Sequence, residues 1–293
     1  MRKNIKRWCV VLLGLIVLLT GCQAQEDKNN QTSSEKYRIV PTTVALTQTL
    51  DALNLDIAGK PDSYKTLPKR YDNVPKVGQP MTPDMEKVQA VHPTHILGVS
   101  TIEDETKPKF KMIKAKAIFY DYDSLKGMKT SISQMGKEFN RETEASKLNQ
   151  KLTHAEEQIR QKAAQQKHPK VLILMGVPGS YLVATNRSYI GNLVEIAGGE
   201  NVIKEDSKQY LASNTEYLYD VYPDIILRLP HGMPEEVKKM FDKEFKENDI
   251  WKHFKAVKTG RVYDLEEQPF GITANIDAVQ AMQDLYDIFY NKK

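Results

Sequence analysis

The sequence predicts an α/β fold of two lobes, each with a central parallel sheet, joined by one long connecting helix. The main observation is a repeated pattern: VQAVHPTHIL (Val88–Leu97) and LYDVYPDIIL (Leu218–Leu227) each read as the end of a short helix, a proline that stops it, and a buried strand. An opening strand precedes each pattern, at Tyr37–Val40 and at Lys170–Gly176. Because strands that alternate with helices form parallel sheets, we expect one such sheet in each half.

Glycine breaks and a long amphipathic segment complete the two halves. LNLDIAGKP (Leu53–Pro61) and NLVEIAGGENV (Asn192–Val202) each end an apolar helix with Ala-Gly, which is a C-cap signal. Between the halves, apolar residues at spacings of three and four predict two helices, the second capped at Asn140. The two series are Leu125, Met128, Ile132, Met135 and Phe139, then Leu148, Leu152, Ala155, Ile159 and Ala163. We therefore expect an N-terminal lobe at residues 37–139, a connecting helix at 140–168 and a C-terminal lobe at 169–293.

The N-terminus predicts export and a lipid anchor. Residues 1–21 combine a basic start with an apolar run, which is typical of a secretory signal and too short for a stable membrane span. LTGC, ending at Cys22, resembles a bacterial lipobox, whose cysteine is lipidated; the alternative is an ordinary thiol after a conventional cleavage site. Residues 22–36 are polar and predict a disordered tether. Without the signal, Lys+Arg falls from 42 to 38, equal to Asp+Glu, so no nucleic-acid partner is expected.

These features together resemble the single-helix-hinge class of substrate-binding lipoproteins, which serve ABC importers of haem, siderophores and cobalamin. The stretches RIVPTTVALT, GKPDSYKTLP, HPKVLILMGVPGSYLVAT, ILRLPHGMPEEVKKMF and VYDLEEQPFGITAN are similar to the haem receptors of that class, over nearly the whole mature chain. The resemblance implies two Rossmann-like lobes of the class III periplasmic-binding-protein type and haem as the ligand. It further implies an ABC permease and haem-donating cell-wall proteins as partners, and a palmitate-bearing lipid anchor on the extracellular face of the cell membrane. We expect a monomer.

Two residues from opposite lobes are candidate ligands of the haem iron. His231 lies between the apolar strand that ends at Pro230 and a helix start at Pro234, so it follows the carboxyl end of a strand. Met81 lies in GQPMTPDME, just ahead of a helix predicted to begin with Thr82 as cap and Pro83 at the first helical position. Imidazole and thioether form a known axial pair for haem iron. Without a Cys-x-x-Cys-His sequence, binding would be reversible.

The resemblance assigns the ligand roles to Met81 and His231, but both residues also have structural interpretations. Met81 could pack on its own helix, and His231 could cap the helix that follows it. Met233 is a nearby thioether, which we expect to pack under that helix. The remaining histidines are expected to be structural or solvated, namely His92, His95, His154, His168 and His253, and no set of residues for a zinc site is present.

Further candidate contacts concern the porphyrin and the permease. Helix starts are expected after both opening strands, in VPTTVALT and MGVPGSYL, and helix N-termini bind anions. We expect Pro41, Thr42, Thr43 and Val44 to hold the propionates, or simply to cap the helix, and we expect apolar walls from Tyr64, Val177, Tyr181 and Phe270. Glu86 and Glu216 hold equivalent places in the repeat, and the resemblance implies that they dock onto the permease; the alternative is capping, since Glu216 fits a capping box with Ser213.

Other functions compete with the haem receptor. A siderophore or cobalamin receptor is the nearest alternative, because Arg228 stands beside the histidine loop and arginines bind the oxygens of ferric siderophores. A surface-anchored hydrolase belongs to another class. The chain has neither a Gly-x-Ser-x-Gly elbow nor a His-Glu-x-x-His sequence, so no enzyme activity is expected.

Overall fold

The computed structural model describes residues 37–213 and 217–291, and the chain from Tyr37 onward forms one compact unit. The predictions for the signal at residues 1–21, the lipidation of Cys22, the tether at 22–36 and the role of Glu216 fall outside the described residues. Within the described ranges, no helix is both long enough and apolar enough to cross a lipid bilayer.

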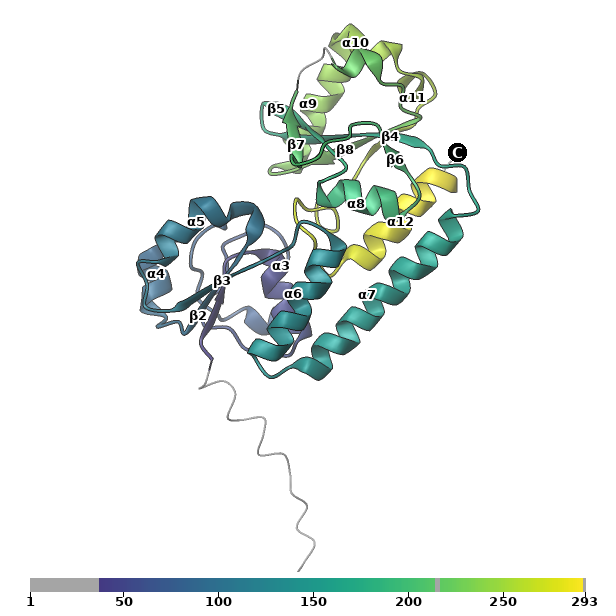
Figure 1. Cartoon of the computed structure of the whole chain (residues 1–293). Helices are drawn as coiled ribbons and strands as arrows, with labels where there is room; N and C mark the ends of the chain where they lie inside the picture. The colour runs from purple at the N-terminus through teal and green to yellow at the C-terminus, as the bar shows by residue number, and fades with distance from the viewer. Residues whose placement is uncertain (1–36, 214–216, 292–293) are drawn as a thin grey trace, which may run out of the picture. The chain divides into compact units, whose positions relative to one another are not determined.

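Strands and helices alternate along most of this unit (Figure 1). The strands are β1 (Ile39–Pro41), β2 (His95–Val99), β3 (Lys116–Tyr120), β4 (Lys170–Val177), β5 (Ser180–Ala184), β6 (Glu200–Asn201), β7 (Tyr210–Ala212), β8 (Ile225–Pro230) and β9 (Val262–Asp264). The helices are α3 (Val44–Ala52), α4 (Met85–Ala90), α5 (Glu103–Phe110), α6 (Leu125–Glu138), α7 (Glu142–Ala163), α8 (Tyr189–Ile196), α9 (Pro234–Glu247), α10 (Asp249–His253), α11 (Lys255–Lys258) and α12 (Ala278–Tyr290). Short 3-10 helices lie at Lys69–Tyr71, Ser100–Ile102 and Tyr217–Asp220.

The first sheet is parallel throughout, with the strand order β1-β2-β3. Val40 of β1 pairs with Ile96 of β2, and Leu97 of β2 pairs with Ile118 of β3. Val40, Ile96 and Leu97 are fully buried, because helices α3 and α5 cover the sheet. Strands buried on both faces carry continuous apolar runs, which explains the apolar sequence of β1 and β2. The parallel sheet predicted for the first half is confirmed.

The second sheet is mixed. Its order is β7-β5-β4-β8-β9, with β6 beside β4; β4 is parallel to β6 and β8, and β8 is parallel to β9. β5 is antiparallel to β4, and β7 is antiparallel to β5. The helix start expected in Met175–Leu182 is therefore wrong: Pro178 and Gly179 close a hairpin instead. Gly179 has φ 82°, a conformation that glycine adopts without a steric penalty.

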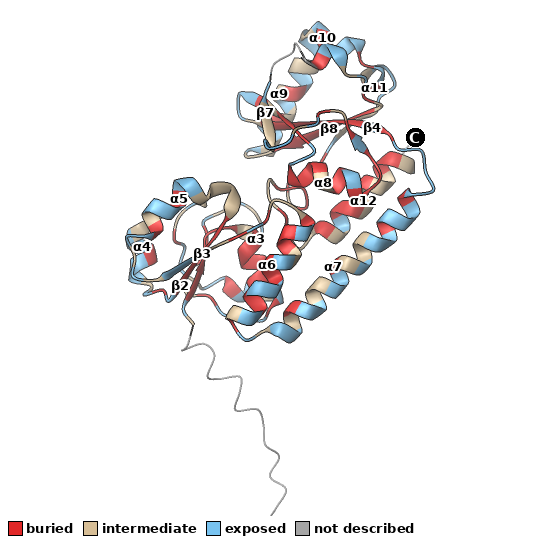
Figure 2. Ribbon diagram, in the orientation of Figure 1, coloured by how far each residue is buried: buried red, intermediate tan, exposed pale blue. Residues whose placement is uncertain are grey.

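Helix α7 is the long helix between the two sheets in the sequence, and it packs against α6, α8 and α12 (Figure 2). Both predicted apolar series face the core: the residues of the first are fully buried, and in the second Leu148 and Ala155 are partly buried. α7 has 22 residues and its N-cap is Arg141. The expected cap at Asn140 is wrong, because Asn140 takes the left-handed conformation (φ 55°) in the connection after α6.

The two Ala-Gly signals have different outcomes. In the second half, α8 ends at Ile196 and Gly198 follows with φ 87°, so the predicted glycine C-cap is confirmed. In the first half, α3 ends at Ala52, and Asn54 (φ 53°) takes the left-handed conformation after it. Gly59 therefore does not cap α3. A Cβ at Gly59 would lie 2.6 Å from Val77 Cγ1, so close packing explains the glycine.

Candidate functional site

His231 lies directly after β8, a central strand of the second sheet. Its backbone N–H donates to the carbonyl oxygen of Gly176 on β4 at 2.8 Å, which fixes the residue against the sheet. Gly232 (φ 62°) and Met233 (φ 56°) then turn the chain through left-handed conformations, and α9 begins at Pro234, as expected. Because ligands of open α/β sheets bind beyond the carboxyl ends of the strands, His231 stands where a ligand is expected.

Glu267 is the charged partner of His231. Its Oε1 lies 2.8 Å from His231 Nδ1, although the N–H direction is off the line of a well-formed hydrogen bond. The same oxygen accepts hydrogen bonds from the Tyr64 hydroxyl (2.5 Å) and from the Gly232 N–H (3.3 Å). Lys65 Nζ lies 3.6 Å from Oε1 and donates to the Glu267 carbonyl oxygen at 3.2 Å. Residues from distant parts of the chain thus converge on one buried carboxylate, which we call the Glu267 cluster (Tyr64, Lys65, His231, Gly232 and Glu267).

The cluster keeps its carboxylate ionised. Burial alone would raise the pKa of Glu267, but the close contact with His231, the hydrogen bond from Tyr64 and the charge of Lys65 lower this pKa to about 2. Burial lowers the pKa of Lys65 in spite of the attraction of Glu267. Burial, and then the hydrogen bond to Glu267, raise the pKa of the Tyr64 hydroxyl far above its usual range. At neutral pH the cluster therefore holds a charged acceptor with a neutral tyrosine donating to it.

Sequence reasoning missed Glu267. It follows β9 in DLEEQP, where Glu266 and Glu267 are indistinguishable by residue type. The structure separates them, since Glu266 is exposed whereas Glu267 is only 8% exposed. The one available signal was its place just after a strand. That signal becomes specific only once β9 is known to pair with β8, the strand that carries His231, and such pairing is not readable from the sequence.

Met81 lies on a tight turn ahead of α4. The Thr82 N–H donates to the Gln79 carbonyl oxygen at 3.1 Å, and Lys109 Nζ donates to the Met81 carbonyl oxygen at 3.0 Å. The Met81 residue is 57% exposed, so its thioether is accessible from solvent. Among the described residues, Met81 shares no hydrogen bond or ion pair with the Glu267 cluster. Met81 and His231 are thus both accessible ligand candidates, and no hydrogen bond or ion pair among the described residues links Met81 to the cluster that contains His231.

The helix after Met81 begins later than expected. α4 starts at Met85, and its N-cap is Asp84, whose side chain accepts a hydrogen bond from the Lys87 N–H. Thr82 and Pro83 therefore lie in the turn, and the predicted cap at Thr82 is wrong. The carboxylate of Asp84 interacts more favourably with the positive end of the helix than a hydroxyl would.

The expected porphyrin walls fall into two groups. The Tyr64 residue is 66% exposed although its hydroxyl is held by Glu267, and Val177 is half-buried at the end of β4. Tyr181 and Phe270 are 8% and 2% exposed and belong to the hydrophobic core. Their rings are covered by protein, so we do not include them in the site. Met233 is 53% exposed, and the expectation that it packs under α9 is wrong, because its left-handed backbone precedes the helix.

The segment from Pro41 to Val44 connects β1 to α3. The Thr42 hydroxyl donates to the Leu97 carbonyl oxygen at 2.9 Å, and Thr43 is the N-cap, with its hydroxyl oxygen accepting from the Leu46 N–H at 3.3 Å. Pro41, Thr42 and Thr43 are buried and Val44 is half-buried. Capping is therefore established for Thr43, and the hydroxyls of Thr42 and Thr43 are both engaged in internal hydrogen bonds.

The other predicted residues lie elsewhere. Glu86 is exposed on the first turn of α4. His95 is buried, with Nδ1 2.8 Å from the Thr94 hydroxyl and Nε2 3.2 Å from Glu138 Oε1, so its role is structural. The remaining histidines are exposed, as expected: His92, His154, His168 and His253. Within the described part of the chain, no three His, Cys, Asp or Glu side chains are grouped so that they could hold a metal ion.

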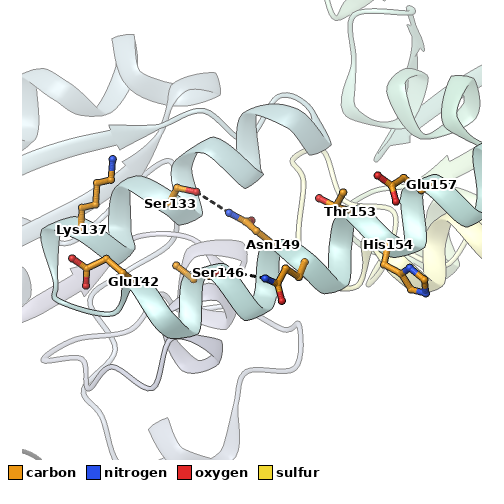
Figure 3. A pocket seen from close by; sticks show the side chains of 10 residues that line it. Ser133, Lys137, Glu142, Ser146, Asn149, Thr153, His154 and Glu157 are labelled. Atoms are coloured by element: carbon orange, nitrogen blue, oxygen red, sulfur yellow. Dashed lines mark hydrogen bonds between the residues drawn. The ribbon is translucent and has the colours of Figure 1, made fainter.

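Two hollows lie away from the Glu267 cluster. The larger, of about 530 Å³, is a polar groove between α6 and α7, with Lys137, Asn149 and His154 on its walls (Figure 3). The smaller, of about 270 Å³, lies between Tyr222 and Phe254. Neither hollow is lined by a residue of the Glu267 cluster.

Comparison with known proteins identifies the family. Residues 39–269 match the family model described as periplasmic binding protein. The chain belongs to the periplasmic binding protein family. Among its relatives, the high-affinity heme uptake system protein IsdE of Staphylococcus aureus (strain Newman) is 62% identical over 291 residues, which cover 99% of each chain.

Two solved structures have the same fold as this chain. The crystal structure of S. aureus IsdE complexed with heme has a TM-score of 0.84 and 67% identity, covering 87% of this chain and 99% of that one. An ABC transporter substrate-binding protein from Listeria monocytogenes EGD-e has a TM-score of 0.82 and 51% identity, with the same coverage. The α/β class predicted from the sequence is confirmed. The family is one of binding and transport proteins.

Arg228 has a structural role in this periplasmic binding protein. Its guanidinium donates to both carboxylate oxygens of Asp264 at 2.7 Å, and it lies 2.9 Å from Asp242 Oδ1. It also stacks on Phe241 and Phe245, with its Cζ atom 5.5 and 5.2 Å from the ring centroids. Because these contacts occupy the guanidinium, Arg228 is not available to the oxygens of a ferric siderophore.

Proposed function

We propose that this chain is a haem receptor, which holds haem between two lobes and delivers it to an ABC permease without catalysing a reaction. The lobes are residues 37–139 and 169–293, joined by the helix at 140–168. The observation that carries the proposal is His231, an accessible imidazole held beyond the end of a sheet strand. The chain that contains it is 62% identical to a heme uptake protein and shares its fold with a heme complex.

His231 and Met81 are proposed as the axial ligands. An imidazole coordinates iron through a nitrogen that carries no proton, and His231 Nδ1 faces Glu267, so Nε2 is the nitrogen left for the iron. The exposed Met81 supplies a thioether, a soft ligand that favours the reduced metal. Neither bond is covalent to the porphyrin, so the cargo can be released to the permease.

The porphyrin would contact residues around these ligands. We assign the aromatic face of Tyr64 and the side chain of Val177 as walls, since both are accessible. The segment Pro41–Val44 at the start of α3 is proposed to hold a propionate through the N–H groups of Thr43 and Val44, because the N–H groups of a helix start and its dipole attract anions. Thr43 acts there through its backbone N–H, since its hydroxyl oxygen caps the helix. Thr42 positions the turn, because its N–H and its hydroxyl both donate to the Leu97 carbonyl oxygen.

The N-terminus is proposed to anchor the receptor to the membrane, and two carboxylates are proposed to dock it onto the permease. Lipidation of Cys22 would anchor the protein at the extracellular face of the membrane, with residues 23–36 as a tether. Glu86, exposed on α4, and Glu216 are proposed to dock onto basic residues of the two halves of the permease. Haem would arrive from cell-wall proteins, and the receptor would act as a monomer.

Haem titration of the fragment from Gln23 to Lys293 tests the proposal. We expect saturable one-to-one binding with a Soret band and low-spin features. His231→Ala and Met81→Ala should each change the spectrum, whereas His253→Ala and Met112→Ala, which alter an exposed histidine and an exposed methionine, should not. Absence of saturable binding would reject the haem receptor and favour a siderophore or cobalamin receptor. Binding unaffected by the first two substitutions would reject the site.

A further inference from the structure

We infer that Glu267 is the positioning residue of His231: its carboxylate keeps the imidazole proton on Nδ1 and directs Nε2 toward the iron of the bound cargo. The inference rests on the proposed function, because haem is taken as the cargo. It goes beyond that function by giving a role to Glu267, a residue that is proposed neither as an iron ligand nor as a porphyrin contact.

The geometry brings the carboxylate to the correct side of the ring. Glu267 follows β9, which pairs in parallel with β8, and His231 follows β8, so both side chains arise at the same edge of the second sheet. Oε1 lies 2.8 Å from Nδ1. The Gly232 N–H, adjacent in the chain to His231, donates to that same oxygen, so the turn and the ring share one acceptor. The carboxylate therefore contacts both the backbone and the side chain of the ligand loop.

Charge decides which tautomer this contact stabilises. An ionised carboxylate can only accept hydrogen bonds, and a neutral imidazole has one N–H and one bare nitrogen. Beside Glu267, the neutral ring of His231 must therefore carry its proton on Nδ1, since a bare Nδ1 would repel the oxygen. Nε2 then keeps the lone pair that coordinates a metal, and the carboxylate increases the basicity of the ring.

The carboxylate is itself held from the first half of the chain. Tyr64 donates to Oε1 at 2.5 Å and Lys65 Nζ lies 3.6 Å from it, and these two residues precede Glu267 by 203 and 202 positions in the sequence. The side chain of Glu267 is only 6% exposed, so water cannot replace these donors. Because Tyr64 and Lys65 fix the carboxylate from one side, it can fix His231 from the other.

Glu267→Gln in the full-length protein tests the inference, because glutamine keeps the shape and can donate as well as accept. Nitrogen NMR of the histidine-labelled apo protein reads the tautomer of His231. We expect the Nδ1-protonated form in the wild type, a shift toward the Nε2-protonated form in Glu267→Gln, and no shift in Glu266→Gln, which alters the exposed neighbour. An unchanged His231 tautomer in Glu267→Gln would overturn the inference.

Haem binding supplies the second readout. Glu267→Gln should retain one-to-one stoichiometry but bind haem about 10- to 100-fold more weakly, as for other partners of metal-bound histidines. The reduction potential should rise, because the ring becomes a weaker donor to ferric iron. Glu267→Asp, which restores a carboxylate, should recover the wild-type tautomer and part of the affinity. If Glu267→Gln does not fold, Glu267→Asp provides the test. An Nε2-protonated His231 in Glu267→Asp would also overturn the inference.

The two readouts separate the inference from the proposed function. If the wild type binds no haem, the proposed function fails, and the tautomer of the apo protein still decides whether Glu267 positions His231. If the wild type binds haem but neither tautomer nor affinity responds to Glu267→Gln, the inference fails and the haem receptor stands.

Discussion

We also predict how Glu267→Gln changes the pH dependence of the stability of the apo protein, because the buried carboxylate links folding to pH. The pKa of Glu267 is about 2 in the folded chain, against an ordinary value of 4.5. A carboxylate whose pKa is lower when folded stabilises the fold above its unfolded pKa, and this stabilisation is lost as the pH falls through the folded pKa. The free energy of unfolding of the wild type should therefore fall relative to that of Glu267→Gln as the pH is lowered from 4.5 to about 2.

The magnitude follows from the two pKa values. At about 1.36 kcal/mol per pKa unit, the ionised carboxylate contributes about 3 kcal/mol to the free energy of unfolding at pH 7 and about 1 kcal/mol at pH 3. The conversion is justified because the Glu267 side chain is only 6% exposed, so solvent screens its contacts weakly.

Urea unfolding of apo protein at pH 7, 5, 4 and 3, followed by circular dichroism, measures this difference. The difference in unfolding free energy between the wild type and Glu267→Gln should shrink by about 2 kcal/mol from pH 7 to pH 3. Glu266→Gln, at an exposed position, should show a small gap that does not change in this way. A Glu267→Gln gap that stays constant or widens on acidification would refute the reasoning, since the pKa of the carboxylate would then not be lowered by folding.

Two further substitutions test the frame around the site. Arg228→Met should lower the free energy of unfolding by about 3 kcal/mol in urea, because it leaves the Asp264 carboxylate without its bidentate partner. Gly176→Ala should lower the free energy of unfolding by about 1 to 3 kcal/mol and weaken haem binding, because the added Cβ would clash with Val237 Cγ1 of α9 and the Gly176 carbonyl oxygen holds the His231 N–H. In Gly271→Ala the new Cβ would come no nearer than 3.4 Å to any neighbour, so this control should retain stability. Unfolding free energies equal to the wild type in either of the first two variants would contradict the packing described.

Local sequence patterns were sufficient for much of the fold. Helical spacing located α6 and α7 because a helix buries one face, and every third or fourth residue there is apolar. The proline and glycine signals located β2, β8 and the end of α8 for an equally local reason. Each of these features depends on residues that are close together in the sequence.

The errors arose where distant segments decide the structure. Val177-Pro178-Gly179-Ser180 was interpreted as leading into a helix, but the strand after it pairs antiparallel with β4, and pairing depends on both strands. Glu267 was missed for a related reason. Only the pairing of β8 with β9 and the approach of Tyr64 bring it beside His231. Burial then distinguishes it from Glu266, and burial is a property of the whole fold.

The two proposed ligands differ in how firmly the protein holds them, and this difference predicts unequal effects on affinity. His231 follows a central strand, its N–H is bound to Gly176, and its ring rests against Glu267, with 30% of the side chain exposed. Met81 is 57% exposed on a turn, and Lys109 Nζ, on an exposed side chain, donates to its carbonyl oxygen. A ligand that is already ordered loses less conformational entropy on binding.

His231→Ala should therefore weaken haem binding more than Met81→Ala does. The thioether bond is also the weaker one to ferric iron, so the order should be clearest in the oxidised state and should narrow when the iron is reduced. Equilibrium titration of both variants under oxidising and reducing conditions measures the order, with Met112→Ala as the exposed methionine control. If Met81→Ala loses as much affinity for ferric haem as His231→Ala, this prediction is contradicted. Preorganisation of His231 by the sheet and by Glu267 would then not contribute to haem affinity.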